Sequence, residues 1–161
     1  MKKQIAAFVL SIILLLPSVS LAVEPLPAKL SDAATDFKLL DLGGKEIAFT
    51  SSSGKPALLF FWATWCPFCL KELPSLQKQY ADLKKSGIDV LAIDVGESKE
   101  RVEKFLSKKD KLEFPILLDS DSQVSSAYNL VGIPTFILID AKGKIRSSGH
   151  NLPDGYEQLL K

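Results

Sequence analysis

The fold of this 161-residue chain is decided by residues 57–69, which read ALLFFWATWCPFC. The first six residues form an uninterrupted apolar run of strand length, a pattern typical of a strand that is buried on both faces of a sheet. Cys66 and Cys69 follow, and Pro67 between them suits the first turn of a helix, where its missing N–H costs nothing. The stretch therefore predicts a central strand followed directly by a helix, with both cysteines of the chain at the junction.

The position of the two cysteines has chemical consequences. The start of a helix offers unpaired N–H groups and the positive end of the helix dipole, and both stabilise a thiolate at Cys66. Cys69 lies one turn further on, near enough to close a disulfide with Cys66. Because a thiolate is the attacking species in disulfide exchange, the pair combines a nucleophile with a resolving thiol. A purely structural disulfide is a weaker explanation, since so short a loop constrains little of the unfolded chain.

Strands and helices alternate on both sides of this stretch. Upstream, residues 37–49 predict a β-hairpin. Downstream, the expected elements are a long helix over 66–85, a buried strand over 88–95, a short strand over 116–118, a hairpin with strands at 135–139 and 144–147, and three short amphipathic helices at Val102/Phe105/Leu106, Val124/Ala127/Tyr128 and Tyr156/Leu159/Leu160. This order predicts an α/β fold in which a mixed sheet lies between helices.

The first 22 residues have the three-part plan of a secretory signal peptide. Lys2 and Lys3 form a positive start, and residues 5–16 are apolar except for Ser11. Ser20 and Ala22 supply small side chains at the −3 and −1 positions of a cleavage site. The apolar run is short for a membrane-spanning helix, which takes about 20 residues. An uncleaved N-terminal anchor in the inner membrane, with the domain facing outward, is the alternative.

The predicted organisation is thus a signal peptide or anchor at 1–22, a Pro- and Ala-rich linker at 23–35 and one domain at 36–161, exported to the periplasm or a comparable oxidising compartment. With 20 basic and 19 acidic residues, the chain has no electrostatic footprint for nucleic acid. Two cysteines cannot build a disulfide-rich scaffold. We expect a monomer without a cofactor.

Two separated motifs resemble the thioredoxin superfamily: FWATWCPFC at 61–69 and GIPTFILID at 132–140. Within that superfamily the chain looks most like the TlpA/ResA-like exported thiol–disulfide oxidoreductases, from about Phe37 to the C-terminus. The resemblance implies a thioredoxin-like three-layer sandwich. It also implies that Cys66 is the exposed nucleophile and that Cys69 is the buried resolving thiol.

The same resemblance assigns a surface for the client protein. Pro134 matches the cis-proline that faces the disulfide, where the Ile133 backbone would pair with an incoming peptide. Trp65, Pro67 and Phe68 would complete the client-binding surface. For Trp65, simple packing in the core is the alternative interpretation.

One departure from the thioredoxins concerns the acidic residue that takes the proton of the resolving thiol. Cytoplasmic thioredoxins carry a buried aspartate six residues before the first cysteine, and here that position is Phe60, which cannot move protons. TlpA/ResA-like proteins have a glutamate three residues after the second cysteine, and Glu72 matches it. The resemblance therefore implies that Glu72 relays the proton of the Cys69 thiol, and a surface acid on an amphipathic helix is the alternative. Pro74 matches the proline that kinks the active-site helix.

The residues between the cysteines favour a reductant. Strong oxidants of this fold carry a histidine where Phe68 stands, so only the helix start stabilises the Cys66 thiolate, and a less stabilised thiolate means a less oxidising couple. We expect the protein to reduce disulfides of client proteins, apocytochrome c being one example that the family implies, and to be re-reduced by a membrane-embedded thiol donor. A disulfide oxidant or isomerase is the alternative.

Two other function classes fit less well. An exported Sco-like copper protein would use two cysteines and a distal histidine, for which His150 is the candidate, but its cysteines are spaced CxxxC; in this sequence His150 lies in a polar run typical of the surface. A zinc site would need four ligands, where Cys66, Cys69 and His150 offer three. A peroxiredoxin would place a single peroxidatic cysteine in a different motif.

Overall fold

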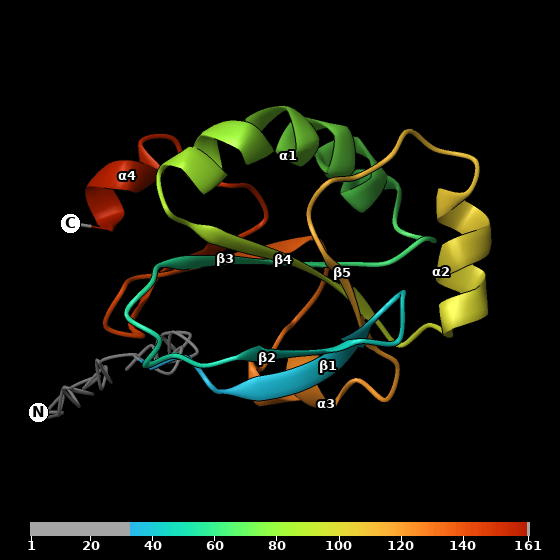
Figure 1. Ribbon diagram of the computed structural model, residues 1–161, viewed down its shortest axis with the longest axis horizontal. Coiled ribbons are helices and arrows are strands. Elements are labelled where there is room, and N and C mark those ends of the chain that lie inside the picture. The colour runs from blue at the N-terminus through green and yellow to red at the C-terminus, as the bar shows by residue number, and fades with distance from the viewer. Residues whose placement is uncertain (1–32, 161) are drawn as a thin grey trace, which may run out of the picture.

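The computed structural model describes residues 33–160 (Figure 1). The predicted signal peptide and most of the predicted linker lie outside these residues. Within the described part, no helix is both long enough and apolar enough to cross a membrane.

Seven strands form one mixed sheet in the order β2-β1-β5-β4-β3-β6-β7. The central strand β3 (Ala57–Trp62) runs parallel to β4 (Asp89–Val95) and antiparallel to β6 (Thr135–Ile139). The remaining strands are β1 (Phe37–Asp41), β2 (Glu46–Phe49), β5 (Ile116–Asp119) and β7 (Ile145–Gly149). The antiparallel pair β1–β2 is the predicted N-terminal hairpin, and the pair β6–β7 is the predicted C-terminal one.

Helices cover both faces of the sheet and confirm the predicted three-layer α/β sandwich (Figure 1). The long helix α1 (Pro67–Lys85) and the short α4 (Tyr156–Leu159) lie over one face, and α3 (Gln123–Ala127) lies under the other. Helix α2 (Lys99–Leu106) packs at the side of the α1 layer, where its Val102 is fully buried. Each predicted helix and strand is present, with ends displaced by a few residues at most.

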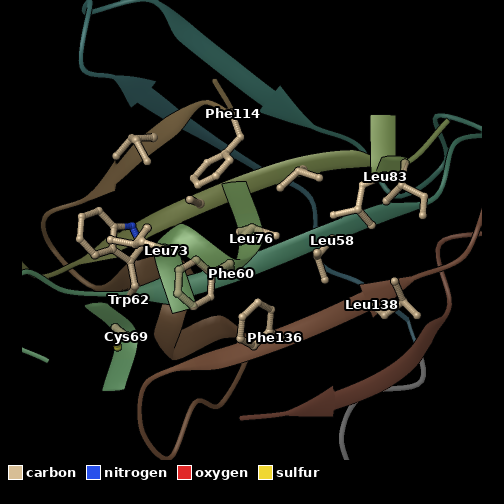
Figure 2. Close-up of a cluster of buried hydrophobic side chains, with 14 of the residues drawn as sticks. Leu58, Phe60, Trp62, Cys69, Leu73, Leu76, Leu83, Phe114, Phe136 and Leu138 are labelled. Atoms are coloured by element: carbon tan, nitrogen blue, oxygen red, sulfur yellow. The ribbon is translucent and has the colours of Figure 1, made fainter. Parts of the chain in front are cut away.

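Successive side chains of β3 point to opposite faces of the sheet, and this divides the core into two clusters. Leu58, Phe60 and Trp62 face α1 and pack with its residues Leu73 and Leu76 (Figure 2). The residues between them on β3 point to the opposite face, where they meet β1, β2 and α3. Because successive side chains of a strand point to opposite faces, an apolar strand with helices on both sides is buried throughout, and all six residues of β3 are at most 2% exposed.

The register of the central strands gathers three loops at one edge of the sheet. At the C-terminal end of β3, Trp62 pairs with Asp94 of β4, and Phe61 pairs with Thr135 of β6. The loop before α1, the loop after β4 and the loop before β6 therefore start from neighbouring positions. These loops carry the candidate site.

Residues 33–35, at the end of the predicted linker, are docked on the domain. Ala34 is buried and its N–H donates to the Gly143 carbonyl at 2.8 Å, and Ala33 forms an isolated bridge with Lys144. The Tyr128 hydroxyl donates to the Thr35 carbonyl at 2.8 Å. These contacts are with residues more than 90 positions away in the sequence, so the composition of residues 23–35 gave no sign of them.

Candidate active site

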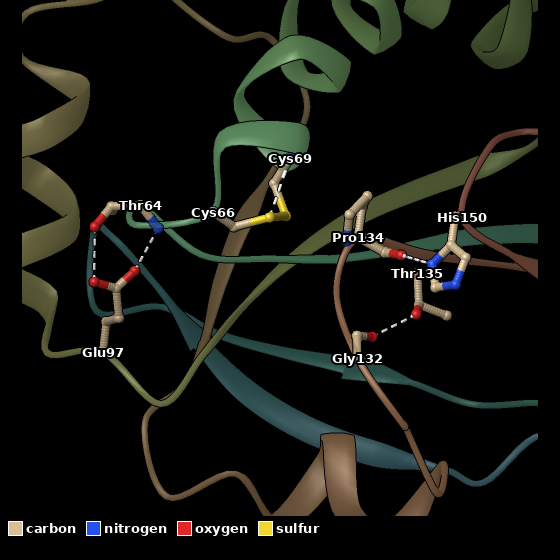
Figure 3. Close-up of a disulfide and its surroundings, with 8 residues drawn as sticks. All are labelled: Thr64, Cys66, Cys69, Glu97, Gly132, Pro134, Thr135 and His150. Carbon is tan, nitrogen blue, oxygen red and sulfur yellow. Dashed lines mark hydrogen bonds between the residues drawn. A yellow bond between two sulfur atoms is a disulfide. The ribbon is translucent and has the colours of Figure 1, made fainter.

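The two cysteines are joined at the N-terminus of α1 (Figure 3). Cys66 is the N-cap residue, with extended backbone angles, and Pro67 occupies the first turn, as predicted. The Cys66 and Cys69 Cα atoms are 5.3 Å apart in the disulfide, and the Cys69 N–H donates to Cys66 Sγ at 3.1 Å. A backbone donor at the helix start is thus aimed at the first sulfur, and such a donor stabilises a thiolate there.

The expectation that Cys66 is exposed is wrong for this disulfide-bonded form. Cys66 is only 3% exposed and Cys69 is fully buried. Both belong to the hydrophobic cluster under α1. Cys66 remains the less buried of the two.

The loop before β6 lies across from the disulfide (Figure 3). The peptide bond between Ile133 and Pro134 is cis, which confirms the expectation for Pro134. Two side chains hold this loop: Thr135 Oγ1 donates to the Gly132 carbonyl at 2.7 Å, and His150 Nδ1 lies 2.7 Å from the Pro134 carbonyl oxygen. Sequence reasoning found neither contact.

Exposed apolar side chains surround the disulfide. Of the four large hydrophobic side chains exposed in the described part of the chain, three are Trp65, Phe68 and Val131. Trp65 is 61% exposed, so core packing does not explain it. A shallow cavity of about 350 Å³ lies between Trp65 and the segment that includes Val131 and Ile133. Pro67 is also exposed, whereas Ile133 is half-buried and Pro134 is buried. Binding of a client at these five residues remains a prediction.

The Glu72 carboxylate stands apart from other polar groups. Glu72 is half-buried on α1, and within residues 33–160 it makes no hydrogen bond or ion pair. Phe60, at the position of the thioredoxin aspartate, is fully buried and stacks on Phe136 with ring centroids 4.5 Å apart. The relay role of Glu72 remains a prediction.

Two acids that the sequence analysis missed lie behind the loop that leads into Cys66. The Glu97 carboxylate accepts hydrogen bonds from the Thr64 N–H at 2.5 Å and the Thr64 hydroxyl at 2.7 Å, and it pairs with Arg101 (Figure 3). Asp94 is fully buried, and neither of its carboxylate oxygens has a hydrogen-bond partner in the described structure. Burial, followed by the neighbouring Glu97, raises the pKa of Asp94 to about 8.

A sequence signal existed for these acids but not for His150. Asp94 ends a predicted buried strand and Glu97 follows it, and the carboxyl ends of adjacent parallel strands meet at one edge of a sheet. His150 reaches the loop only because of the register of the β6–β7 hairpin.

Among residues 33–160 no three His, Cys, Asp or Glu side chains gather closely enough to hold a metal ion, so the three donors of the copper alternative are not brought together.

Comparisons with known proteins agree with this geometry. The model of the AhpC/TSA family matches residues 30–148. The thiol-disulfide oxidoreductase ResA of Geobacillus thermodenitrificans is 38% identical over 154 residues, which cover 91% of this chain and 88% of that protein.

Two solved structures have the same fold. A Chlorobium tepidum protein named as a thiol:disulfide interchange protein DsbE superimposes with a TM-score of 0.70 at 28% identity, covering 80% of this chain and 93% of that one. A secreted disulfide oxidoreductase of Mycobacterium tuberculosis, described as homologous to DsbE of E. coli, gives a TM-score of 0.62 at 31% identity and covers 77% and 91%.

Proposed function

We propose a function from one premise: the chain belongs to the AhpC/TSA family and, like its ResA relatives, is a thiol–disulfide oxidoreductase. The proposal is that it acts outside the cytoplasm as a reductant of disulfides in client proteins. The observation that carries it is the Cys66–Cys69 disulfide at a helix N-terminus, facing a cis-proline loop within an apolar, exposed surface.

The proposed reaction starts from the reduced pair. The Cys66 thiolate attacks one sulfur of a client disulfide, a mixed disulfide forms, and the other client sulfur leaves as a thiolate that takes a proton from water. Glu72 then accepts the proton of the Cys69 thiol, and the Cys69 thiolate attacks Cys66 Sγ. The client's second sulfur leaves as a thiolate. The client gains two electrons, and the protein ends in the disulfide state described above.

The reducing direction rests on what lies beside Cys66. The nearest donor to its sulfur is the Cys69 N–H, and the residue at the position where strong oxidants carry a histidine is Phe68. The Phe68 ring lies 5.6 Å from Lys71 Nζ, but an aromatic ring donates no proton to the sulfur. Neutral backbone donors stabilise a thiolate moderately, so reduction of the pair is not strongly favoured and its electrons are readily given up.

The client surface is proposed to consist of Trp65, Pro67, Phe68 and the Ile133–Pro134 loop. Burial of exposed aromatic rings against a partner contributes most of the energy at such contacts. Apocytochrome c, reduced before haem attachment, is one candidate client, and a membrane-embedded thiol donor would restore the dithiol. Support for export comes from the pattern of residues 1–22 and from the secreted relative in M. tuberculosis.

Trapping of clients tests this function. In a Cys69→Ala variant the mixed disulfide on Cys66 cannot be resolved, so we expect client proteins to be recovered from cells as disulfide-linked complexes that dissociate on reduction. The matched control is the Cys66→Ala/Cys69→Ala double variant, which should recover none. Equal recovery from both variants, or none from either, would refute the function.

A further inference from the structure

The single histidine of the chain contacts the loop opposite the disulfide. His150 directly follows β7, whose last residue, Gly149, pairs with Phe136 of β6. Pro134 lies two residues before Phe136, beyond the end of this ladder, so its carbonyl has no strand partner on that side. The His150 ring supplies the partner instead, with Nδ1 at 2.7 Å from the carbonyl oxygen (Figure 3).

Two side chains therefore hold the carbonyls on either side of Ile133. Thr135 Oγ1 donates to the Gly132 carbonyl, and His150 holds the Pro134 carbonyl. Within residues 33–160, the N–H and C=O of Ile133 itself make no hydrogen bond. The loop thus presents the backbone N–H and C=O of Ile133 for hydrogen bonding, while the Gly132 and Pro134 carbonyls on either side are held in place.

We propose that His150 is a positioning residue for client binding: it fixes the peptide group after Pro134 so that the Ile133 edge meets an extended client segment in one orientation. This inference rests on the proposed function, because it assumes a polypeptide client. The substrate class follows: a disulfide within an extended peptide, whose backbone pairs with Ile133, as opposed to a small disulfide without one. A loop that is already ordered loses less conformational entropy on binding.

The hydrogen bond constrains the role of the ring. A carbonyl only accepts, so Nδ1 must carry the hydrogen, and it does so both in the imidazolium and in one neutral tautomer. His150 should therefore act by geometry, through its hydrogen bond to the Pro134 carbonyl.

The test is a stopped-flow comparison of reduced wild-type protein, His150→Ala and His150→Asn. The oxidants are a disulfide-containing peptide and bis(2-hydroxyethyl) disulfide, which has no peptide backbone. The side-chain amide of asparagine places a donor near the position of Nδ1, so His150→Asn is the conservative variant. Asn151→Ala, at the next exposed position, is the matched control.

We expect His150→Ala to raise the half-saturating peptide concentration about 3- to 10-fold, the loss that one net hydrogen bond produces. The limiting rate, the reduction potential and the rate with the small disulfide should stay within twofold of wild type. His150→Asn should recover most of the peptide affinity, and Asn151→Ala should match wild type.

Three results would overturn the inference: unchanged peptide saturation in His150→Ala, no recovery in His150→Asn, or an equal loss with the small disulfide. Failure of the wild-type protein to reduce the peptide would refute the proposed function instead. In that case the carbonyl ¹³C resonance of Pro134 still tests the contact, because it should shift in His150→Ala and return in His150→Asn. An unshifted resonance would contradict the hydrogen bond itself.

Discussion

The two sides of the disulfide are built in different ways. The Cys66 side is one contiguous segment: β3, a short loop and the first turn of α1, capped by its own backbone and sulfur. The Pro134 side is assembled from β6 and the residue after β7, and hydrogen bonds from Thr135 and His150 hold it. Acidic groups lie behind the first side, where Glu97 binds Thr64 and Asp94 is buried beside Trp62.

The difference indicates a division of labour. We propose that the contiguous side sets the reactivity of the sulfurs, because the helix start and the acids lie there. We propose that the assembled side determines how a client is bound, because the unpaired Ile133 peptide groups and the exposed Val131 lie there. Substitutions on the first side should therefore change stability, potential or the resolving step, and substitutions on the second should change client affinity.

The largest expected effect concerns Asp94. Its folded-state pKa of about 8 lies above the unfolded value of 3.8, so the folded protein holds this proton more tightly. The corresponding stability is fully present below pH 3.8 and is lost as the pH rises through about 8, with an upper bound of about 6 kcal/mol. We expect Asp94→Asn to be more stable than wild type at pH 8. Its free energy of unfolding should also change less with pH between pH 5 and 8.

Urea unfolding at several pH values measures this effect. Asp110→Asn, at an exposed position, is the control and should follow wild type. If the free energy of unfolding varied with pH in the same way for wild type and Asp94→Asn, the claim that the buried Asp94 carboxyl holds a proton would be contradicted.

The next effect concerns Glu72. If it takes the proton of Cys69, Glu72→Gln should slow resolution of the mixed disulfide by about 100-fold, the usual scale of general base catalysis, and leave the attack by Cys66 unchanged. Rapid-quench analysis of the mixed disulfide separates the two steps. Glu103→Gln, on the neighbouring helix α2, is the control. Unchanged resolution would identify Glu72 as an ordinary acid on the helix surface.

A smaller effect is expected at Glu97. Glu97→Gln weakens the charged hydrogen bonds to Thr64 and the ion pair with Arg101, which should cost about 1.5–2 kcal/mol of unfolding free energy. Because the loop before Cys66 is loosened, the reduction potential should also move, while peptide saturation should not. Chemical denaturation and redox titration check both. A change in peptide affinity alone would break the division between the two sides.

The smallest effect is expected at Thr135. Thr135→Val keeps the shape but removes the donor to the Gly132 carbonyl, at a cost of about 1 kcal/mol. We predict a few-fold rise in the half-saturating peptide concentration and an unchanged potential, measured as for His150. Thr64→Val, on the other side, should show the reverse pattern. Identical behaviour of the two variants would contradict the comparison.

The same contrast explains what the sequence predicted. Residues 57–69 carry local signals, a buried strand followed by Pro67 at a helix start, and these predicted the junction and the cysteine pair. The contact between His150 and Pro134 and the docking of residues 33–35 join distant segments, and hairpin register decides them. Cys66 is only 3% exposed in the disulfide-bonded form, and the local sequence pattern did not predict this burial.

The central claim, that the contiguous side makes a reductant, is tested most directly by the reduction potential of the Cys66–Cys69 pair. Equilibration with glutathione redox buffers, followed by alkylation of free thiols, gives the value. We predict a potential near or below about −220 mV, since only neutral helix-start donors stabilise the Cys66 thiolate. A potential near −120 mV, the range of a strong oxidant, would contradict it.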